Sequence, residues 1–128
     1  MKVLGIDYGR AKVGLAIGVG SFAEPYDVIR YTDTNSLIEK IGEIVKVEKV
    51  EKIVIGLSEN EIGEATKKFA EALHSSLSPL PFEFFDETLT SQDAQKLSRE
   101  AGMSRKKARG MEDAFAASIM LQNYLDSN

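Results

Sequence analysis

The sequence contains no cysteine, no tryptophan, three prolines and one histidine among its 128 residues. Without cysteine it can form neither a disulfide framework nor a thiolate metal site. The single histidine, His74, excludes a histidine-rich zinc site, and a Ser-His-Asp triad would have to use this residue, which lies among ordinary helix residues. Any bound metal must therefore be held mainly by oxygen ligands, which favours Mg²⁺, Mn²⁺ or Ca²⁺.

The sequence also lacks an excess of positive charge and any long apolar run. The formal net charge is −4, so the chain is not a globally basic nucleic-acid-binding protein. A local basic patch can still bind phosphate groups within about one Debye length, ~8 Å. The N-terminal residues MKVLGIDYGR are too short and too polar for a signal peptide or a membrane span. We therefore expect a cytoplasmic protein without a membrane partner.

The length and composition are those of one globular domain. A chain of 128 residues with 43% hydrophobic and 28% charged residues can bury a proper core. No repeat, linker or low-complexity segment divides it. We predict one domain that spans residues 1–128.

The apolar periodicity predicts a mixed α/β fold. Three short apolar stretches with short connections open the chain and favour an antiparallel meander. Helical and strand patterns then alternate, as in parallel strands joined by helical crossovers. The resulting order, βββαβαβαα, predicts a mixed five-stranded sheet, three antiparallel strands then two parallel, flanked by helices. The strands are expected at residues 2–8, 13–19, 27–31, 52–57 and 81–86, and the helices at 36–45, 61–77, 90–102 and 112–125.

Three acidic residues stand where elements of this sheet begin or end. Asp7 ends the first strand, Glu87 follows the fifth, and Asp113 opens the last helix. Carboxylates that meet at one sheet edge repel one another, and a divalent cation relieves that repulsion. Two such cations ~3.5–4 Å apart would clamp the attacking and leaving oxygens of a phosphodiester displacement. Each acid also has an ordinary explanation, because acids are favoured in the first turn of a helix and in turns.

Four segments resemble motifs of one family, and they follow its order over nearly the whole chain. The opening segment resembles D-Y-G-x-K-R-I-G-x-A, the second G-L-P-x-N-x-x-G, the third D-E-R-L-T-T-x-x-A, and the last D-x-x-A-A-x-x-x-L-Q-x-x-L. The segments are GIDYGRAKVGLAIG, VIGLSENEIGEAT, FDETLTSQDA and MEDAFAASIMLQNYL. On these motifs the chain resembles the YqgF (RuvX) family. The resemblance implies a ribonuclease H-like fold related to Holliday-junction resolvases, and a nuclease that resolves such junctions or processes the 5′ end of precursor 16S ribosomal RNA.

The resemblance also implies roles for the acids. It makes Asp7, Glu87 and Asp113 the catalytic ligands of Mg²⁺ or Mn²⁺, and it places Asp86 beside them as a supporting residue. The chain departs from the motifs at three positions that concern the grip on the substrate. The motif's Lys-Arg pair is replaced by Ala11-Lys12, its arginine after Asp-Glu by Thr88, and its proline after Gly-Leu by Ser58.

Basic residues close to the predicted acids are candidates for nucleic-acid binding. The segment SRKKARG lies just before Asp113 and is interpreted as a flexible cationic loop that contacts phosphate groups. An ordinary solvated loop is the alternative. Gly9 and Gly14 are interpreted as turn and close-packing positions that leave room for a phosphate backbone. The full set of candidates is Arg10, Lys12, Asn60, Arg105, Lys106, Lys107 and Arg109.

Several functions remain open at this point. The leading hypothesis is a metal-dependent nuclease that acts on precursor ribosomal RNA within ribosome precursors. A resolvase of four-way DNA uses the same acids, and resolution usually requires a symmetric dimer, so both a monomer and a homodimer are considered. An ATP-binding kinase or actin-like ATPase opens with a similar strand, but this chain is too short for a two-lobed nucleotide cleft. A non-catalytic RNA- or ribosome-binding module is the last alternative.

Overall fold

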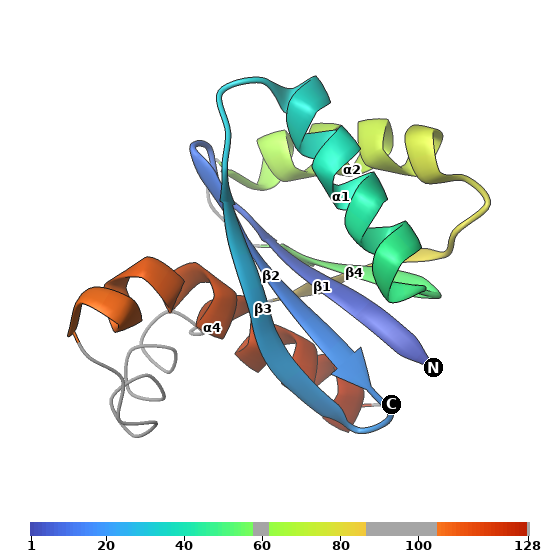
Figure 1. The fold of residues 1–128 in the computed structure, drawn as a ribbon. Helices are drawn as coiled ribbons and strands as arrows, with labels where there is room; N and C mark the ends of the chain where they lie inside the picture. Colours follow the sequence, from blue (N-terminus) through green and yellow to red (C-terminus); the bar gives the residue numbers. More distant parts are fainter. Residues whose placement is uncertain (58–61, 87–104, 128) are drawn as a thin grey trace.

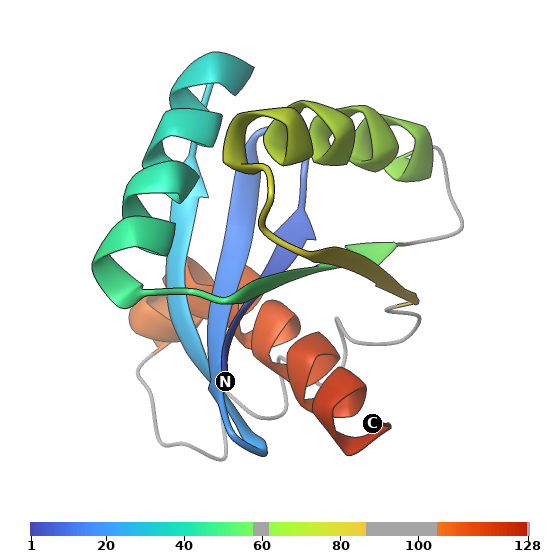
Figure 2. The same cartoon turned by 90° about the vertical axis from the view of Figure 1, so that its right-hand side faces the viewer.

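The computed structural model describes residues 1–57, 62–86 and 105–127, and for residues 62–63, 86 and 105–109 it describes the backbone alone. The fold is a sheet covered by helices on both faces (Figure 1). Helices α1 (Thr34–Glu48) and α2 (Ile62–Leu77) cover one face, and α4 (Arg105–Asp126) crosses the other. Figure 2 shows the three layers from the side. No helix in the described ranges combines the length and the apolar character that crossing a membrane requires.

The sheet has the predicted mixed topology. Its five strands lie in the order β3-β2-β1-β4-β5. β1 pairs antiparallel with β2 and β2 with β3, whereas β1 pairs parallel with β4 and β4 with β5. The described elements therefore confirm three antiparallel strands followed by two parallel ones. The strands are Lys2–Tyr8 (β1), Lys12–Val19 (β2), Phe22–Arg30 (β3), Lys52–Leu57 (β4) and Phe82–Asp86 (β5).

Strand β3 is longer than the sequence predicts. It begins at Phe22, five residues before the expected start, and contains Pro25. A proline is tolerated there because β3 is the edge strand of the sheet and needs no partner on its outer side. The register also shifts between Leu15 and Ala16, so that Leu15 pairs with Asp27 and Ala16 with Pro25. The strand thus has a β-bulge next to the proline.

The start of α1 also differs from the prediction. Ser36 and Glu39 have the spacing of a capping box, but the N-cap residue is Asp33. The Asp33 carboxylate accepts hydrogen bonds from the backbone N–H groups of Asn35 and Ser36 and from the Ser36 hydroxyl. Ser36 is therefore bound by the cap instead of forming it.

The core has two parts, one on each face of the sheet. Alternate residues of β1 and β2 point to opposite faces, so each strand contributes to both parts. One part packs under α1 and α2 and includes Leu4, Ile6, Val13, Leu15, Leu37, Ile41, Phe69 and Leu73. The other packs under α4 and includes Val3, Ala16, Val54, Ala117, Met120, Leu121 and Tyr124.

Helix α4 begins at Arg105, about two turns before the predicted start near Glu112. The predicted cationic loop is therefore wrong, since the backbone of residues 105–110 is helical. Arginine, lysine and alanine are strong helix formers, and the only weak position in this run is Gly110, which costs about 1 kcal/mol. The helix expected at residues 90–102 lies outside the described residues.

Hydrogen bonds hold the C-terminal half of α4 at two places on its face of the sheet, one near the β2–β3 turn and one on β4 and β5. The Gln122 side chain accepts a hydrogen bond from the Ala23 N–H (2.9 Å) and donates one to the Ser21 carbonyl (2.8 Å), both next to the β2–β3 turn. On the other side, the Tyr124 hydroxyl donates to Glu83 (2.6 Å), which also pairs with Lys52 (2.6 Å). The hydrogen bond from Lys52 lowers the pKa of Glu83. These contacts orient the helix axis, and with it the position of Asp113.

Candidate metal and phosphate site

Asp7 lies on the α4 side of the central strand β1. Val3 packs against α4, and a side chain on Gly5 would meet Leu121 of α4 at 3.0 Å. Because side chains alternate along a strand, Asp7 points to the same side, while Ile6 and Tyr8 contribute to the opposite core. Asp7 is half-buried. The apolar strand therefore places one carboxylate near its C-terminal end, facing α4.

Gly14 brings Asp113 next to Asp7. Gly14 is the residue of β2 directly opposite Asp7 in the antiparallel pair, where Cα atoms lie ~4.5–5.5 Å apart. A Cβ atom on Gly14 would lie 1.9 Å from the Asp113 carbonyl oxygen, so α4 touches the sheet backbone here. Only glycine permits this approach. The convergence of Asp7 and Asp113 predicted from the sequence thus follows from the contact of α4 with Gly14, which makes room for a helix backbone, not for a phosphate backbone.

Lys12 forms an ion pair with Asp113 on the same side of the sheet as Asp7. It is two residues before Gly14 on β2, so it lies on the α4 side of the sheet. Its Nζ atom is 3.0 Å from Asp113 Oδ2, and the two side chains are 38% and 32% exposed. Asp7, Lys12 and Asp113 therefore lie on one side of the sheet, and solvent reaches the Lys12–Asp113 pair.

Tyr31 holds the turn that connects β1 to β2. Its hydroxyl donates a hydrogen bond to the Gly9 carbonyl (2.6 Å), and its backbone N–H donates to the Ala11 carbonyl (3.1 Å). Burial, followed by the neighbouring Tyr8 hydroxyl, raises the pKa of Tyr31, so its phenol stays protonated and keeps donating. A Cβ atom on Gly9 would lie 2.5 Å from the Lys12 carbonyl oxygen, so the turn is tight. This clamp was not predicted from the sequence.

The Tyr31→Phe substitution is expected to loosen this turn. It removes the donor to the Gly9 carbonyl and leaves the ring in place, so we expect a loss of about 1 kcal/mol in the free energy of unfolding. Hydrogen exchange of the backbone amide of residue 31, which donates to the Ala11 carbonyl, should become faster, which NMR or mass spectrometry can measure. The Tyr26→Phe substitution is the control, since the Tyr26 hydroxyl bonds Glu48 on the surface (3.1 Å). Unchanged exchange of the residue 31 amide in Tyr31→Phe would contradict the clamp.

Tyr8 packs against the core on the opposite face of the sheet. Its ring stacks on Phe69 of α2 at 4.6 Å between centroids, with 23° between the planes, and lies 6.2 Å from the Tyr31 ring. His74 contacts the Phe82 ring at 5.0 Å on the α2 side of the sheet. Neither ring belongs to the acidic site.

The remaining predicted site residues are described in part or not at all. Strand β5 ends at Asp86, which pairs with Leu57 of β4. Because β4 lies between β5 and β1, the backbone of Asp86 is about two strand spacings, ~9.6 Å, from β1. Glu87 and Asn60 lie outside the described residues. Arg10 lies exposed in the β1–β2 turn, and Arg105, Lys106, Lys107 and Arg109 occupy the first turns of α4. Within the described ranges, no group of three or more His, Cys, Asp or Glu residues forms a metal site.

The donor set fits a hard divalent cation. Asp7 and Asp113 offer carboxylate oxygens from two elements that Gly14 holds together. The ion pair with Lys12 shows that Asp113 already accepts a cation at its Oδ2 atom. Oxygen donors of this kind suit Mg²⁺ or Mn²⁺. A third acid would have to come from outside the described residues.

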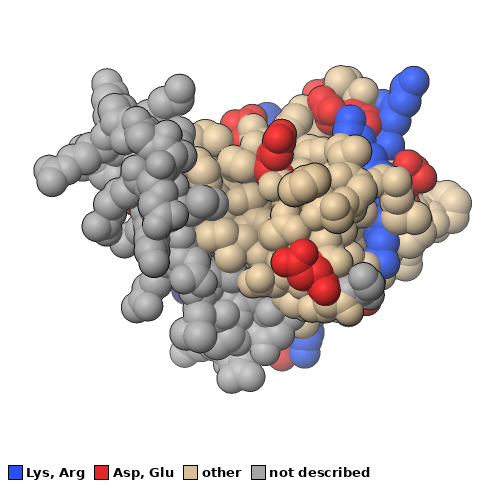
Figure 3. Space-filling view, turned by 90° about the horizontal axis from the view of Figure 1, so that it is seen from below, with Lys and Arg blue, Asp and Glu red and all other residues tan. Residues whose placement is uncertain are grey.

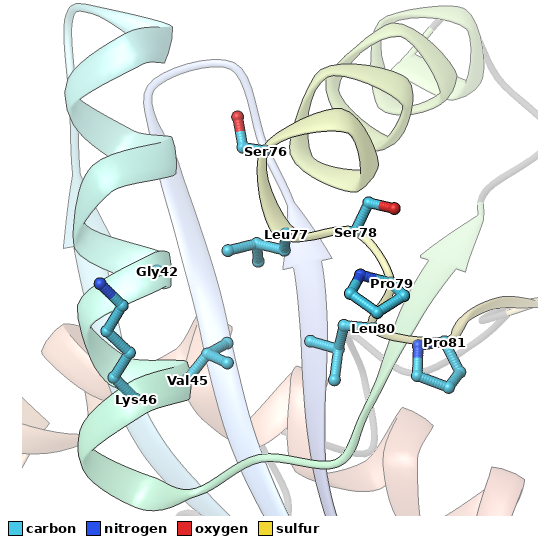
Figure 4. Close-up of a pocket in the computed structure, with 9 residues that line it drawn as sticks. All are labelled: Gly42, Val45, Lys46, Ser76, Leu77, Ser78, Pro79, Leu80 and Pro81. Atoms are coloured by element: carbon cyan, nitrogen blue, oxygen red, sulfur yellow. The ribbon is translucent and has the colours of Figure 1, made fainter.

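An apolar cavity of about 500 Å³ lies elsewhere, between α1 and the segment that leads from α2 to β5. Leu77 and Leu80 point toward Val45, and Lys46 lies at the edge (Figure 4). No carboxylate lines this cavity. It lies on the α1 side of the sheet, opposite to the face of Asp7, and does not contribute to the acidic site.

The described part of the surface in the view from below carries few charged side chains. Figure 3 shows separate acidic groups over this part, with basic side chains gathered toward one margin. No continuous basic surface crosses the described residues in this view.

Comparison with known proteins yields one family. The family described as "RuvX: Holliday junction resolvase" matches residues 1–127. Full-length relatives carry the name "Putative pre-16S rRNA nuclease". The relative from Leuconostoc citreum is 35% identical and covers 100% of this chain and 96% of its own length. The relative from Pelotomaculum thermopropionicum is 38% identical, with coverage of 99% and 88%.

Solved structures of resolvases share the fold. The Holliday junction resolvase of Fowlpox virus has a TM-score of 0.64 at 14% identity and covers 99% of both chains. RuvC from T. thermophilus, in complex with a Holliday junction substrate, has a TM-score of 0.62 at 14% identity, with coverage of 99% and 94%. The predicted ribonuclease H-like fold is confirmed.

Proposed function

The chain belongs to the RuvX family, and from this premise we propose that it is a metal-dependent nuclease that hydrolyses phosphodiester bonds of precursor 16S ribosomal RNA. The observation that carries the proposal is the contact of α4 with Gly14. This contact supports a site in which Asp7 and Asp113 act together, because Gly14 pairs with Asp7 and touches the Asp113 backbone, and the Asp113 side chain is partly exposed.

Each residue has a distinct role in the proposed reaction. Asp7 and Asp113 would hold Mg²⁺ or Mn²⁺, and Glu87, the residue after the end of β5, would supply a third carboxylate with Asp86 beside it. A bound metal ion lowers the pKa of a water molecule and neutralises charge on the scissile phosphate. Lys12 and Arg10 bind the phosphate groups that flank the scissile bond, and the first turns of α4 extend this contact. Tyr31 holds the β1–β2 turn in the orientation that presents the side chains of Lys12 and Arg10.

Precursor ribosomal RNA is favoured over four-way DNA by the similarity of the relatives. Proteins named for the RNA substrate are 35–38% identical to this chain over nearly its whole length, whereas the resolvase structures are 14% identical. The resolvase activity remains the second candidate, because the family description and the RuvC complex both concern Holliday junctions. Ribosome precursors in the cytoplasm are the setting that this RNA substrate implies.

A substrate panel tests the proposal. The purified chain is incubated with a 5′-extended 16S precursor transcript, an unrelated single-stranded RNA and a four-way DNA junction, each with Mg²⁺, Mn²⁺ or EDTA. We expect metal-dependent cleavage of the precursor and no cleavage in EDTA. Cleavage of the junction alone by a dimeric form would favour the resolvase. Binding of the precursor without cleavage at any metal concentration would overturn the nuclease and favour a non-catalytic RNA-binding module.

A further inference from the structure

The Lys12–Asp113 ion pair occupies the position at which the proposed function requires a metal ion. We propose that Lys12 is an internal competitor of the metal: it neutralises Asp113 in the metal-free protein and is released to bind the substrate phosphate when the metal binds. This inference rests on the proposed function, because it takes Asp113 as a metal ligand. It adds an order to binding, in which metal precedes nucleic acid.

Because the two groups are so close, the ion pair and a metal ion bound to the same carboxylate compete with each other. Lys12 Nζ lies 3.0 Å from Asp113 Oδ2, at hydrogen-bonding distance. A divalent cation on the same carboxylate would lie ~2.0–2.1 Å from its oxygen and thus within a few ångströms of the ammonium group. Charges of the same sign at that separation repel strongly even near the surface. Metal binding therefore disfavours the ion pair.

Lys12 can leave Asp113 without any change in the fold. Its backbone is held in β2, opposite Arg30, and Tyr31 clamps the preceding turn. Its side chain is 38% exposed and has a flexible four-carbon stem. The ammonium group therefore moves about a fixed pivot at the edge of the site. Once released, it remains beside Asp113 and points into solvent, where a phosphate bound at the site would meet it.

The proposal predicts opposite effects of one substitution. In Lys12→Met the competitor is absent, so Mn²⁺ should bind about fivefold to tenfold more tightly at low ionic strength. The same variant lacks the released cation, so its affinity for a precursor transcript in the presence of metal should fall by a similar factor. If the ion pair were purely structural, its removal would not tighten metal binding. If Lys12 were a permanent phosphate ligand, it would not compete with the metal.

The experiment measures Mn²⁺ binding by isothermal titration calorimetry without nucleic acid. The variants are Lys12→Met, Lys12→Arg and Lys12→Gln, the last as a second neutral residue in case Met perturbs folding. Lys2→Met is the matched control, because Lys2 pairs with Glu48 at the same distance of 3.0 Å at the other end of β1. We expect tighter binding in both neutral variants of Lys12, and an unchanged affinity in Lys12→Arg and Lys2→Met.

An Asp113→Asn arm separates the two proposals. If Asp113→Asn weakens Mn²⁺ binding and the neutral variants of Lys12 do not strengthen it, the competition is overturned and the metal site stands. If Asp113→Asn leaves Mn²⁺ binding unchanged, the proposed metal site itself is wrong. If Lys12→Met and Lys2→Met tighten binding equally, the effect is one of net charge and the competition is again overturned.

Discussion

Alanine in place of Gly14 is expected to lower the free energy of unfolding by about 3 kcal/mol or more. The added Cβ atom would lie 1.9 Å from the Asp113 carbonyl oxygen and 2.3 Å from its carbon. Both atoms belong to the backbone of α4, so no side-chain rotation can relieve the clash. The helix must move away from the sheet and open the core around Ala117 and Leu121. Urea denaturation followed by circular dichroism measures the loss.

Two other glycines provide matched controls. Alanine at Gly18 would meet only side-chain atoms, Leu125 Cδ1 at 3.1 Å and Leu121 Cδ2 at 3.2 Å, so a smaller loss is expected. Alanine at Gly110 has no neighbour within 4 Å and lies inside α4, so it should stabilise the protein by about 0.5–1 kcal/mol. If Gly14→Ala is as stable as the parent chain, α4 does not touch β2 here, and the proximity of Asp7 and Asp113 loses its basis.

The sheet could be predicted from the sequence because its signals are local. Alternating or continuous apolar residues mark strands within a few positions, and the short connections between the first three require antiparallel pairing. The errors have two origins: the edge position of β3 admits Pro25, and local helix signals at Asp33 and in the basic run were not recognised. Pro25 is accepted because β3 is at the edge, and Asp33 caps α1 although Ser36 and Glu39 have the pattern of a cap. The basic run before Asp113 is helical because its residues are good helix formers.

The candidate site could be predicted only to the level of its acids. Asp7 stood out because a carboxylate near the end of a buried strand is unusual, and strand ends share one edge of the sheet. The Lys12–Asp113 pair and the Tyr31–Gly9 hydrogen bond join residues 101 and 22 positions apart, and no local pattern encodes either. Gly14 carried a usable signal, since a glycine inside a strand often marks a close backbone approach.

The Asp7→Asn substitution is expected to reduce metal-dependent cleavage of a precursor 16S transcript on the order of 10³-fold. Asparagine keeps the shape of the side chain but removes the negative charge that the proposed site uses to hold the metal. A loss of about 4 kcal/mol of transition-state stabilisation corresponds to this factor. Mn²⁺ affinity measured by calorimetry should fall in parallel. Because Asp7 is half-buried on the α4 side, circular dichroism and thermal melting must confirm that the variant folds.

Glu24→Gln is the control for charge. Glu24 is an exposed acid of the same sheet, opposite Ile17 on the edge strand β3, and its substitution removes the same single charge far from the site. We expect its cleavage rate and Mn²⁺ affinity to match those of the parent chain. If Asp7→Asn folds and still cleaves at the parent rate, the proposed site is wrong whatever the substrate. If both variants lose activity equally, the loss reflects net charge at the protein surface. The proposed site of Asp7 and Asp113 is then not the catalytic centre.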